Sequence, residues 1–336
     1  MKNLVISVVV TLSLVVVSAM ADDNTGVAKK TSAIEITDVR GTKHIVMNCE
    51  SDLGFGGGLV FDHLDDDFYS RAKLMKTLIA VELHTPEAQE KIFKVAVDRG
   101  MSPPVNESDE SRCHTMLLIP PSSIKDITFT QEKIGDHIQT RSVICLAGGE
   151  PFDGGGGFTK LSGQENLGSL GTSDFSAYFT DIKEIRSLAP VPFVGDFAFF
   201  RSTEVPFSAK VTDTAGEVIV LKKALYCDTA ESSKPIPGYL NTVRFISVRF
   251  QSNLGVVLGG VNHLSIPPSK LRTIRLINGK NSISWGRVDA KAILRTGENY
   301  DLTIVTYYPS GILGASSKGW IWIPWFAVAS IEFEDK

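Results

Sequence analysis

Few residues in this chain have the types and spacing that metal binding needs. Asp62, His63, Asp65 and Asp67 form an acidic loop whose oxygen ligands could hold a divalent cation. Their spacing matches no calcium loop, so a solvated acidic loop is the preferred interpretation. None of the six histidines belongs to a His-x-His or His-x-x-x-His pair. We therefore predict no metal site and keep these four residues as weak candidates.

Nucleophilic catalysis has equally little support. Ser70 and Lys73 fit the pattern Ser-x-x-Lys, but its companion motifs are missing, and the chain has no Gly-x-Ser-x-Gly. Cys113 stands beside His114, but neighbours in a strand point to opposite faces. The glycine-rich runs at 54–58 and 154–157 do not continue into Gly-Lys-Ser/Thr, which favours hairpin loops over a phosphate site. The prediction is a non-catalytic protein without a cofactor.

The tryptophans are the most informative residues for binding. All four lie in the C-terminal part of the chain, at 285, 320, 322 and 325. Strand alternation places Trp320 and Trp322 on the face opposite Ile321 and Ile323. Two outward aromatic rings form a flat apolar platform that could stack on a sugar or seat a protein partner. Packing against a neighbouring part of the chain is the alternative. The candidate binding residues are Trp320, Trp322, Trp325 and His263.

The elements that must position these side chains recur along the sequence. An alternating strand ends in Ile-Pro, proline stops ladder pairing, and a second apolar series begins a few residues later. The gap suits a single 3₁₀ turn, so each copy reads as strand, tight turn and strand. A copy without proline lies around Ile182 and Ile185. The three full copies are Ile119-Pro120 with Ile124, Ile127 and Phe129; Ile266-Pro267 with Leu271, Ile274 and Leu276; and Ile323-Pro324 with Val328, Ile331 and Phe333.

A second recurring feature lies upstream of these copies. The stretches 36–41 and 211–216 both carry Thr-Asp followed three residues later by Gly, and an apolar strand comes next. Asp and Gly between β-rich runs predict a hairpin turn. Weaker equivalents are Gly135 and Asn278-Gly279. Between the hairpin at 36–41 and Ile119-Pro120, Thr85-Pro86 opens a helix. Ile92, Phe93 and Ala96 form its apolar stripe.

The order hairpin, middle strand, Ile-Pro strand, tight turn and last strand resembles small SH3-like or Sm-like barrels. The resemblance covers most of the chain after residue 31, and it implies short strands that close a compact barrel in each unit. The fold expected is all-β, with four tandem units and one helical insertion at about 62–112; a β-sandwich built from paired units is the alternative. The expected boundaries are 32–130, 131–189, 207–277 and 278–336, with an apolar connector at 190–206.

The N-terminal segment of the sequence predicts export from the cytosol. Lys2, the apolar run 4–17 and Ala19-x-Ala21 predict a signal peptide at 1–21, cleaved before Asp22. An uncleaved anchor helix is the alternative. The net charge is −4, which argues against nucleic acid as a partner. The cysteines Cys49, Cys113, Cys145 and Cys227 permit two disulfides in an exported protein, and four buried thiols are the alternative.

The sequence therefore favours an exported binding or scaffolding protein of the cell envelope, periplasm or cell exterior. Its expected partner is an envelope protein or a polysaccharide, with no membrane span left after signal cleavage. A carbohydrate-binding protein that uses the tryptophan platform is the alternative. A hydrolase with its site in the insertion of the first unit is the lesser one.

Overall fold

The computed structural model describes ten stretches of the chain. They are residues 33–51, 77–99, 113–134, 137–156, 160–193, 205–235, 242–258, 262–277, 287–305 and 310–334. All of them belong to one unit of contacts that runs from Ser32 to Lys336. The signal segment at 1–21, the acidic loop and Trp285 lie outside the described residues.

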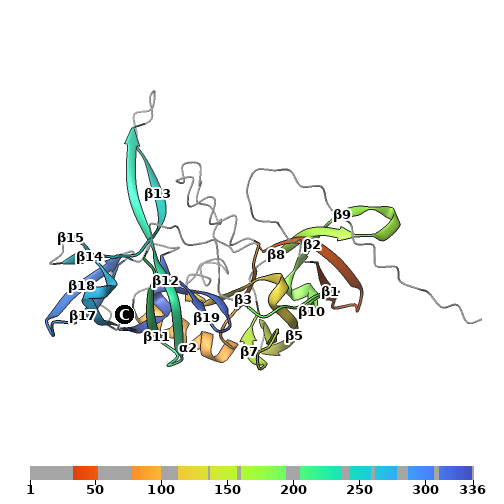
Figure 1. Cartoon of the computed structure of the whole chain (residues 1–336), viewed down its shortest axis with the longest axis horizontal. Coiled ribbons are helices and arrows are strands. Elements are labelled where there is room, and N and C mark those ends of the chain that lie inside the picture. The colour runs from red at the N-terminus through yellow and green to blue at the C-terminus, as the bar shows by residue number, and fades with distance from the viewer. Residues whose placement is uncertain are drawn as a thin grey trace, which may run out of the picture. The chain divides into compact units, whose positions relative to one another are not determined.

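The described strands form two antiparallel sheets (Figure 1). The first has the order β7 (Phe152–Gly155), β6 (His137–Leu146), β5 (Ile124–Ile134), β10 (Ile182–Ser187), β1 (Ile34–Asp38), β2 (Lys43–Ser51), β8 (Lys160–Asn166), β9 (Thr172–Tyr178). The second has the order β15 (Asn262–Ile266), β14 (Leu254–Leu258), β18 (Asn299–Val305), β17 (Arg287–Leu294), β16 (Leu271–Leu276), β21 (Val328–Phe333), β11 (Phe207–Asp213), β12 (Val218–Pro235), β19 (Gly311–Ser316), β20 (Gly319–Pro324), β4 (Met116–Ile119), β3 (Ile79–Glu82). β13 (Thr242–Gln251) belongs to the same sheet but stands outside this order, because its partner β12 also pairs with β11 and β19.

The all-β class is confirmed, but the closed barrels that the resemblance implied are wrong. Neither sheet returns to its first strand within the described residues. Strands from different predicted units share each sheet instead. β1 pairs with β10, and β5 pairs with β6, so the outer strands of units one and two are exchanged. In the same way β11 pairs with β21 and β16 with β17. The division into four units stays a prediction.

The tight turns after the Ile-Pro strands are confirmed as one-turn 3₁₀ helices. They are η2 (Pro121–Ser123), η5 (Pro268–Lys270) and η6 (Trp325–Ala327), and η4 (Phe179–Asp181) occupies the copy without proline. The strand after each turn carries one extra residue against its partner. Leu271 and Thr273, for example, pair with consecutive residues of β17. Such a bulge lets positions 1, 4 and 6 of β10 and β16 face the core, which explains their mixed helix-like and strand-like spacing.

Each of these four 3₁₀ turns also accepts a hydrogen bond from a hairpin turn. The donors are the backbone N–H groups of Val39, Ala147, Thr214 and Arg295, and the acceptors are the carbonyls of Asp181, Ser123, Ala327 and Lys270 respectively, at 2.8–3.0 Å. The hairpins predicted at Gly41 and Gly216 are confirmed, with φ of 86° and 93°. Gly135 and Asn278-Gly279 lie outside the described residues. The turns that donate to η2 and η5 follow Leu146 and Leu294 instead.

The predicted helix is confirmed as α2 (Pro86–Asp98), which lies between β3 and β4 in the sequence. Its buried residues are Gln89, Ile92 and Ala96, with Phe93 packed at the edge of the core. Thr85 is the N-cap, although its side chain makes no capping hydrogen bond. Arg99 is the C-cap residue and follows the last turn.

One end of each sheet is covered by the chain itself. Glu82 in β3 donates its backbone N–H to Gly156 directly after β7, at 2.8 Å, and the terminal strands of the two sheets thus meet there. The other two terminal strands, β9 and β15, each pair with one neighbour among the described strands. These two strands are open edges among the described strands, as is β13, which pairs with β12 alone.

Candidate functional site

The tryptophan platform is not at the surface. Trp320 and Trp322 do point to the face opposite Ile321 and Ile323, as the alternation predicted, but their exposed fractions are 1% and 3%. They pack with Leu118, Leu313 and other apolar residues in a second core cluster. Both rings are buried, with Leu118 of the neighbouring strand β4 opposite Trp320, so the expectation of an exposed platform is wrong and the packing alternative holds. Carbohydrate binding stays a prediction that these residues no longer support.

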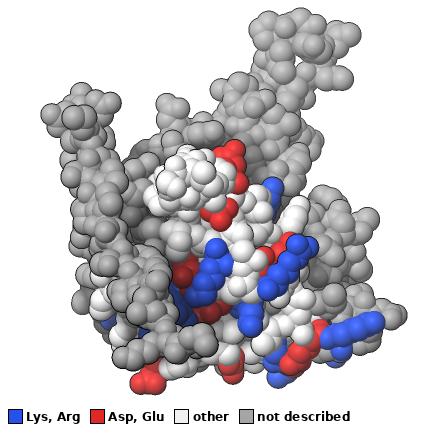
Figure 2. All heavy atoms as spheres, turned by 90° about the vertical axis from the view of Figure 1, so that its right-hand side faces the viewer, with Lys and Arg blue, Asp and Glu red and all other residues white. Residues whose placement is uncertain are grey.

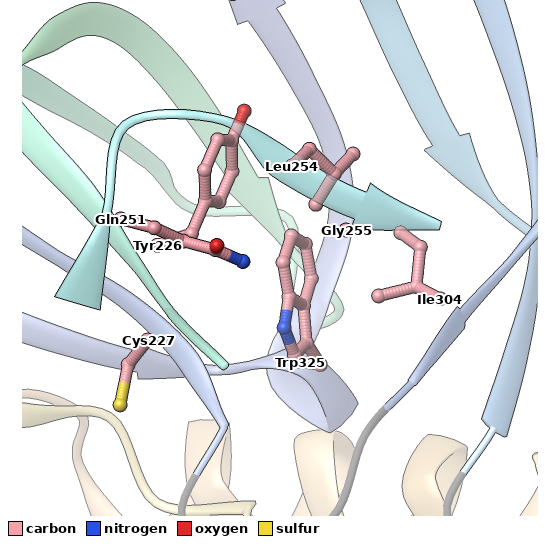
Figure 3. A pocket seen from close by; sticks show the side chains of 7 residues that line it. All are labelled: Tyr226, Cys227, Gln251, Leu254, Gly255, Ile304 and Trp325. Atoms are coloured by element: carbon pink, nitrogen blue, oxygen red, sulfur yellow. The ribbon is translucent and has the colours of Figure 1, made fainter. Parts of the chain in front are cut away.

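The other two binding candidates, Trp325 and His263, differ in exposure. Trp325 is buried, and its ring stacks on Tyr226 at 6.0 Å between centroids. These two rings line a small hollow together with Gln251, Leu254 and Ile304 (Figure 3). The empty space of the hollow is about 170 Å³ with open solvent included, below the volume of common ligand sites. His263 alone is exposed, on the open edge strand β15.

The predicted disulfides are wrong. Cys49, Cys113, Cys145 and Cys227 all lie in the described residues, and each is a buried thiol outside any disulfide. Cysteine here fills core positions as a small apolar side chain. Burial raises the pKa of the Cys49 thiol to about 12, which makes it unreactive at neutral pH.

Cys113 and His114 do not form a catalytic pair. His114 follows Cys113, but its Nδ1 lies 2.9 Å from Glu82 Oε1, whereas Cys113 packs in the main core. The weak metal candidates Asp62, His63, Asp65 and Asp67 lie outside the described residues.

The chemistry that sequence reasoning missed gathers around His84. This residue lies between β3 and α2, and its buried ring faces two carboxylates from the hairpin that joins β11 to β12. Nε2 lies 2.9 Å from Asp213 Oδ2, and Nδ1 lies 3.3 Å from Glu217 Oε2. Asp213 also accepts the backbone N–H of Glu217 on its Oδ1, at 2.9 Å. One carboxylate therefore closes the hairpin and binds the histidine.

Electrostatics decide the charge of His84. Burial alone would lower its pKa, but the carboxylates of Asp213 and Glu217 outweigh this effect and raise the pKa to about 9. The contact with His84 in turn lowers the pKa of Glu217, against its partial burial, and Lys318 lowers it further. At neutral pH the cluster is an imidazolium between two carboxylates.

The same three side chains could supply ligands to a divalent cation, because one ligand atom from each lies within 4.8 Å of the others. The geometry favours the ion pair instead. The two ring nitrogens face different carboxylates, and a metal would take only one of them. Protonation of the ring at neutral pH also opposes coordination. We interpret the cluster as a structural ion pair.

The other end of α2 binds the same corner of the second sheet. The guanidinium of Arg99 is fully buried, and its Nη1 donates to the carbonyls of Phe326 and Val328 at 3.1 and 2.6 Å. Burial lowers the pKa of Arg99 to about 10, so it stays charged at neutral pH. His84 and Arg99 thus hold both ends of α2 on the corner formed by the β11–β12 hairpin and η6. The segment that carries β4 is fixed in this way beside β20.

Sequence patterns could not reveal this arrangement. Asp213 was visible as a hairpin residue, but nothing near it indicates His84, which lies in the other half of the chain. The local equivalent at the corner of the first sheet is Asp38 with His44 and Glu165. His44 Nδ1 lies 2.7 Å from Glu165 Oε1, and its Nε2 lies 3.8 Å from Asp38 Oδ2, with all three side chains partly exposed.

No family model, no curated protein and no solved structure matches the chain. Among the described residues, none of the helices has the length and apolar character needed to span a bilayer.

Proposed function

We propose that the chain is an exported, non-catalytic binding or scaffolding protein of the cell envelope. The observation that carries the proposal is the state of two open edges, β9 and β15. β9 and β15 contain no lysine and no proline, the residues that usually protect an edge strand from pairing. An edge strand that keeps its backbone groups unpaired is a template for another strand. The predicted signal peptide supports export.

Two further features agree with a binding role. The buried polar groups around His84 and Arg99 contact other parts of the chain, and we interpret both as structural anchors. On the face drawn in Figure 2, acidic and basic side chains are interspersed. The described part of that face therefore offers no basic stripe of the kind that follows a nucleic-acid backbone.

The test is retention of envelope components on the immobilised chain, residues 22–336. Ser176→Lys in β9 and Leu264→Lys in β15 each add a charge at an open edge. Val143→Lys is the matched control, because Val143 is exposed on β6, which has partners on both sides. We expect the wild type and Val143→Lys to retain the same component, and the edge variants to lose it. Retention that no edge variant weakens would contradict edge binding, and retention of a polysaccharide alone would favour the carbohydrate alternative.

A further inference from the structure

Four strands of the molecule hold the same place in the order of elements. β4, β9, β15 and β20 each run directly into a one-turn 3₁₀ helix, namely η2, η4, η5 and η6, and each of these helices accepts a hydrogen bond from a separate hairpin turn. β8 also precedes a 3₁₀ helix, η3 (Gly168–Leu170), but that helix is the turn of the β8–β9 hairpin itself. The residues that cap η2, η4, η5 and η6 are Pro120, Tyr178, Pro267 and Pro324. Counting back from the cap therefore aligns the four strands residue by residue.

Two of these strands pair with each other inside the chain. β20 and β4 are antiparallel, with Trp320 opposite Leu118, Ile321 opposite Leu117, and Trp322 opposite Met116. Ile321 and Leu117 are each the third residue before their cap. The register is thus symmetric about this position, and a strand of this type can pair with another of its type in the same register.

The two remaining strands, β9 and β15, are open edges, and β15 exposes a large apolar residue. The third residue before the cap is buried in β4, β20 and β9, where it is Leu117, Ile321 and Phe175. In β15 it is Leu264, which is 44% exposed. A large apolar side chain that is 44% exposed on an open edge is available to a neighbouring strand.

We propose that β9 of one copy of this chain pairs antiparallel with β15 of a second copy, in the register of β4 and β20. Phe175 then lies opposite Leu264, Ser176 opposite His263, and Asp174 opposite Ser265. The pairing places two apolar side chains together, as Ile321 and Leu117 are inside the chain. The proposal names the partner for the proposed scaffold function and rests on it.

Charge favours this pairing over its symmetric alternatives. In the β9–β15 pair, Asp174 and His263 lie on the same face and on a diagonal, which brings an acid near a histidine. A β9–β9 pair would place two Asp174 carboxylates on that diagonal. A β15–β15 pair would place two His263 rings there. Because the two edges differ, the contact is head-to-tail and adds further copies until a ring closes or a filament grows.

The test uses two variants of the full mature chain, Ser176→Cys and His263→Cys, mixed under mild oxidation. The native thiols are buried, so the added cysteines are the accessible ones. We expect a covalent dimer in the mixture and little from either variant alone. The matched control mixes Ser176→Cys with Val143→Cys, and we expect no crosslink there. A dimer from Ser176→Cys alone would overturn the proposal in favour of β9–β9 pairing.

Two further results complete the test. The double variant Ser176→Cys/His263→Cys should form polymers; a disulfide within one chain would overturn pairing between copies. By light scattering, the mass of the wild type and Val143→Lys should rise with concentration. Leu264→Lys should shift the midpoint of that rise about ten-fold or more. A mass that stays monomeric throughout would overturn the proposal, and edge-dependent retention of an envelope component would then leave the scaffold function standing with a different partner.

Discussion

β4, β20, β9 and β15 hold equivalent places before a 3₁₀ turn, but they differ in pairing. β4 and β20 pair with each other inside the chain, whereas β9 and β15 are open edges. In β4 and β20 each strand has partners on both sides, and both faces of β20 are buried. In β15 one side has no partner among the described strands, and most side chains are exposed. The difference does not lie in the strands alone. Between β3 and β4 in the sequence, α2 is held at both ends on the second sheet, by His84 and Arg99.

Removal of a side chain from the covered pair should have the largest effect. Trp320→Ala deletes a fully buried ring that packs between β20 and β4, and we expect a loss of about 3–5 kcal/mol in the free energy of unfolding. Leu264→Ala, on an open edge, should change it by less than about 0.5 kcal/mol in dilute solution. Denaturant titration measures both. Equal losses would contradict the distinction between covered and open strands.

Loss of the anchor at the end of α2 should come next. Arg99→Met keeps the apolar stem but leaves the buried carbonyls of Phe326 and Val328 without these hydrogen bonds. We expect a cost of about 3 kcal/mol in unfolding free energy, since buried unsatisfied acceptors are not compensated by water. Limited proteolysis should then cut the chain near β4 before β9. An unchanged midpoint of unfolding would show that Arg99 does not hold α2 in place.

The anchor at His84 should make stability depend on pH. Its folded-state pKa, about 9, lies above the ordinary value of 6.5, so protonation favours the folded state. The stabilisation is fully present below about pH 6.5 and is lost as the pH rises through about 9; its size is roughly 3 kcal/mol. Asp213→Asn keeps the Oδ1 acceptor of the hairpin and should flatten this dependence. A pH profile identical in wild type and variant would contradict the ion pair.

The partly exposed cluster in the first sheet should show the smallest effect. His44→Ala removes a histidine whose ring and carboxylate neighbours are solvent-accessible, and we expect less than about 1 kcal/mol. Thermal unfolding of His44→Ala and His84→Ala side by side measures the contrast. A larger loss for His44→Ala would reverse the assignment of the main polar anchor to His84.

Local features of this fold were readable from the sequence because they depend on near neighbours. Pro120, Pro267 and Pro324 mark the 3₁₀ turns, Gly41 and Gly216 mark hairpins, and Thr85-Pro86 opens α2. Pairing between units was not readable, because exchanged strands such as β1 and β10 keep the same alternation whichever partner they have. For the same reason Trp320 read as outward: part of the apolar cluster in which it is buried, such as Leu118 of β4, comes from the other half of the chain.

The most direct measurement is amide hydrogen exchange of the four equivalent strands at low and high protein concentration. The account predicts strong protection in β4 and β20 at every concentration, since both are paired inside the chain. It predicts fast exchange at the open amides of β9 and β15 in dilute solution, and protection of both strands together as the concentration rises. Slow exchange in β9 and β15 at all concentrations, or protection that never changes, would contradict the claim that these edges await a partner strand.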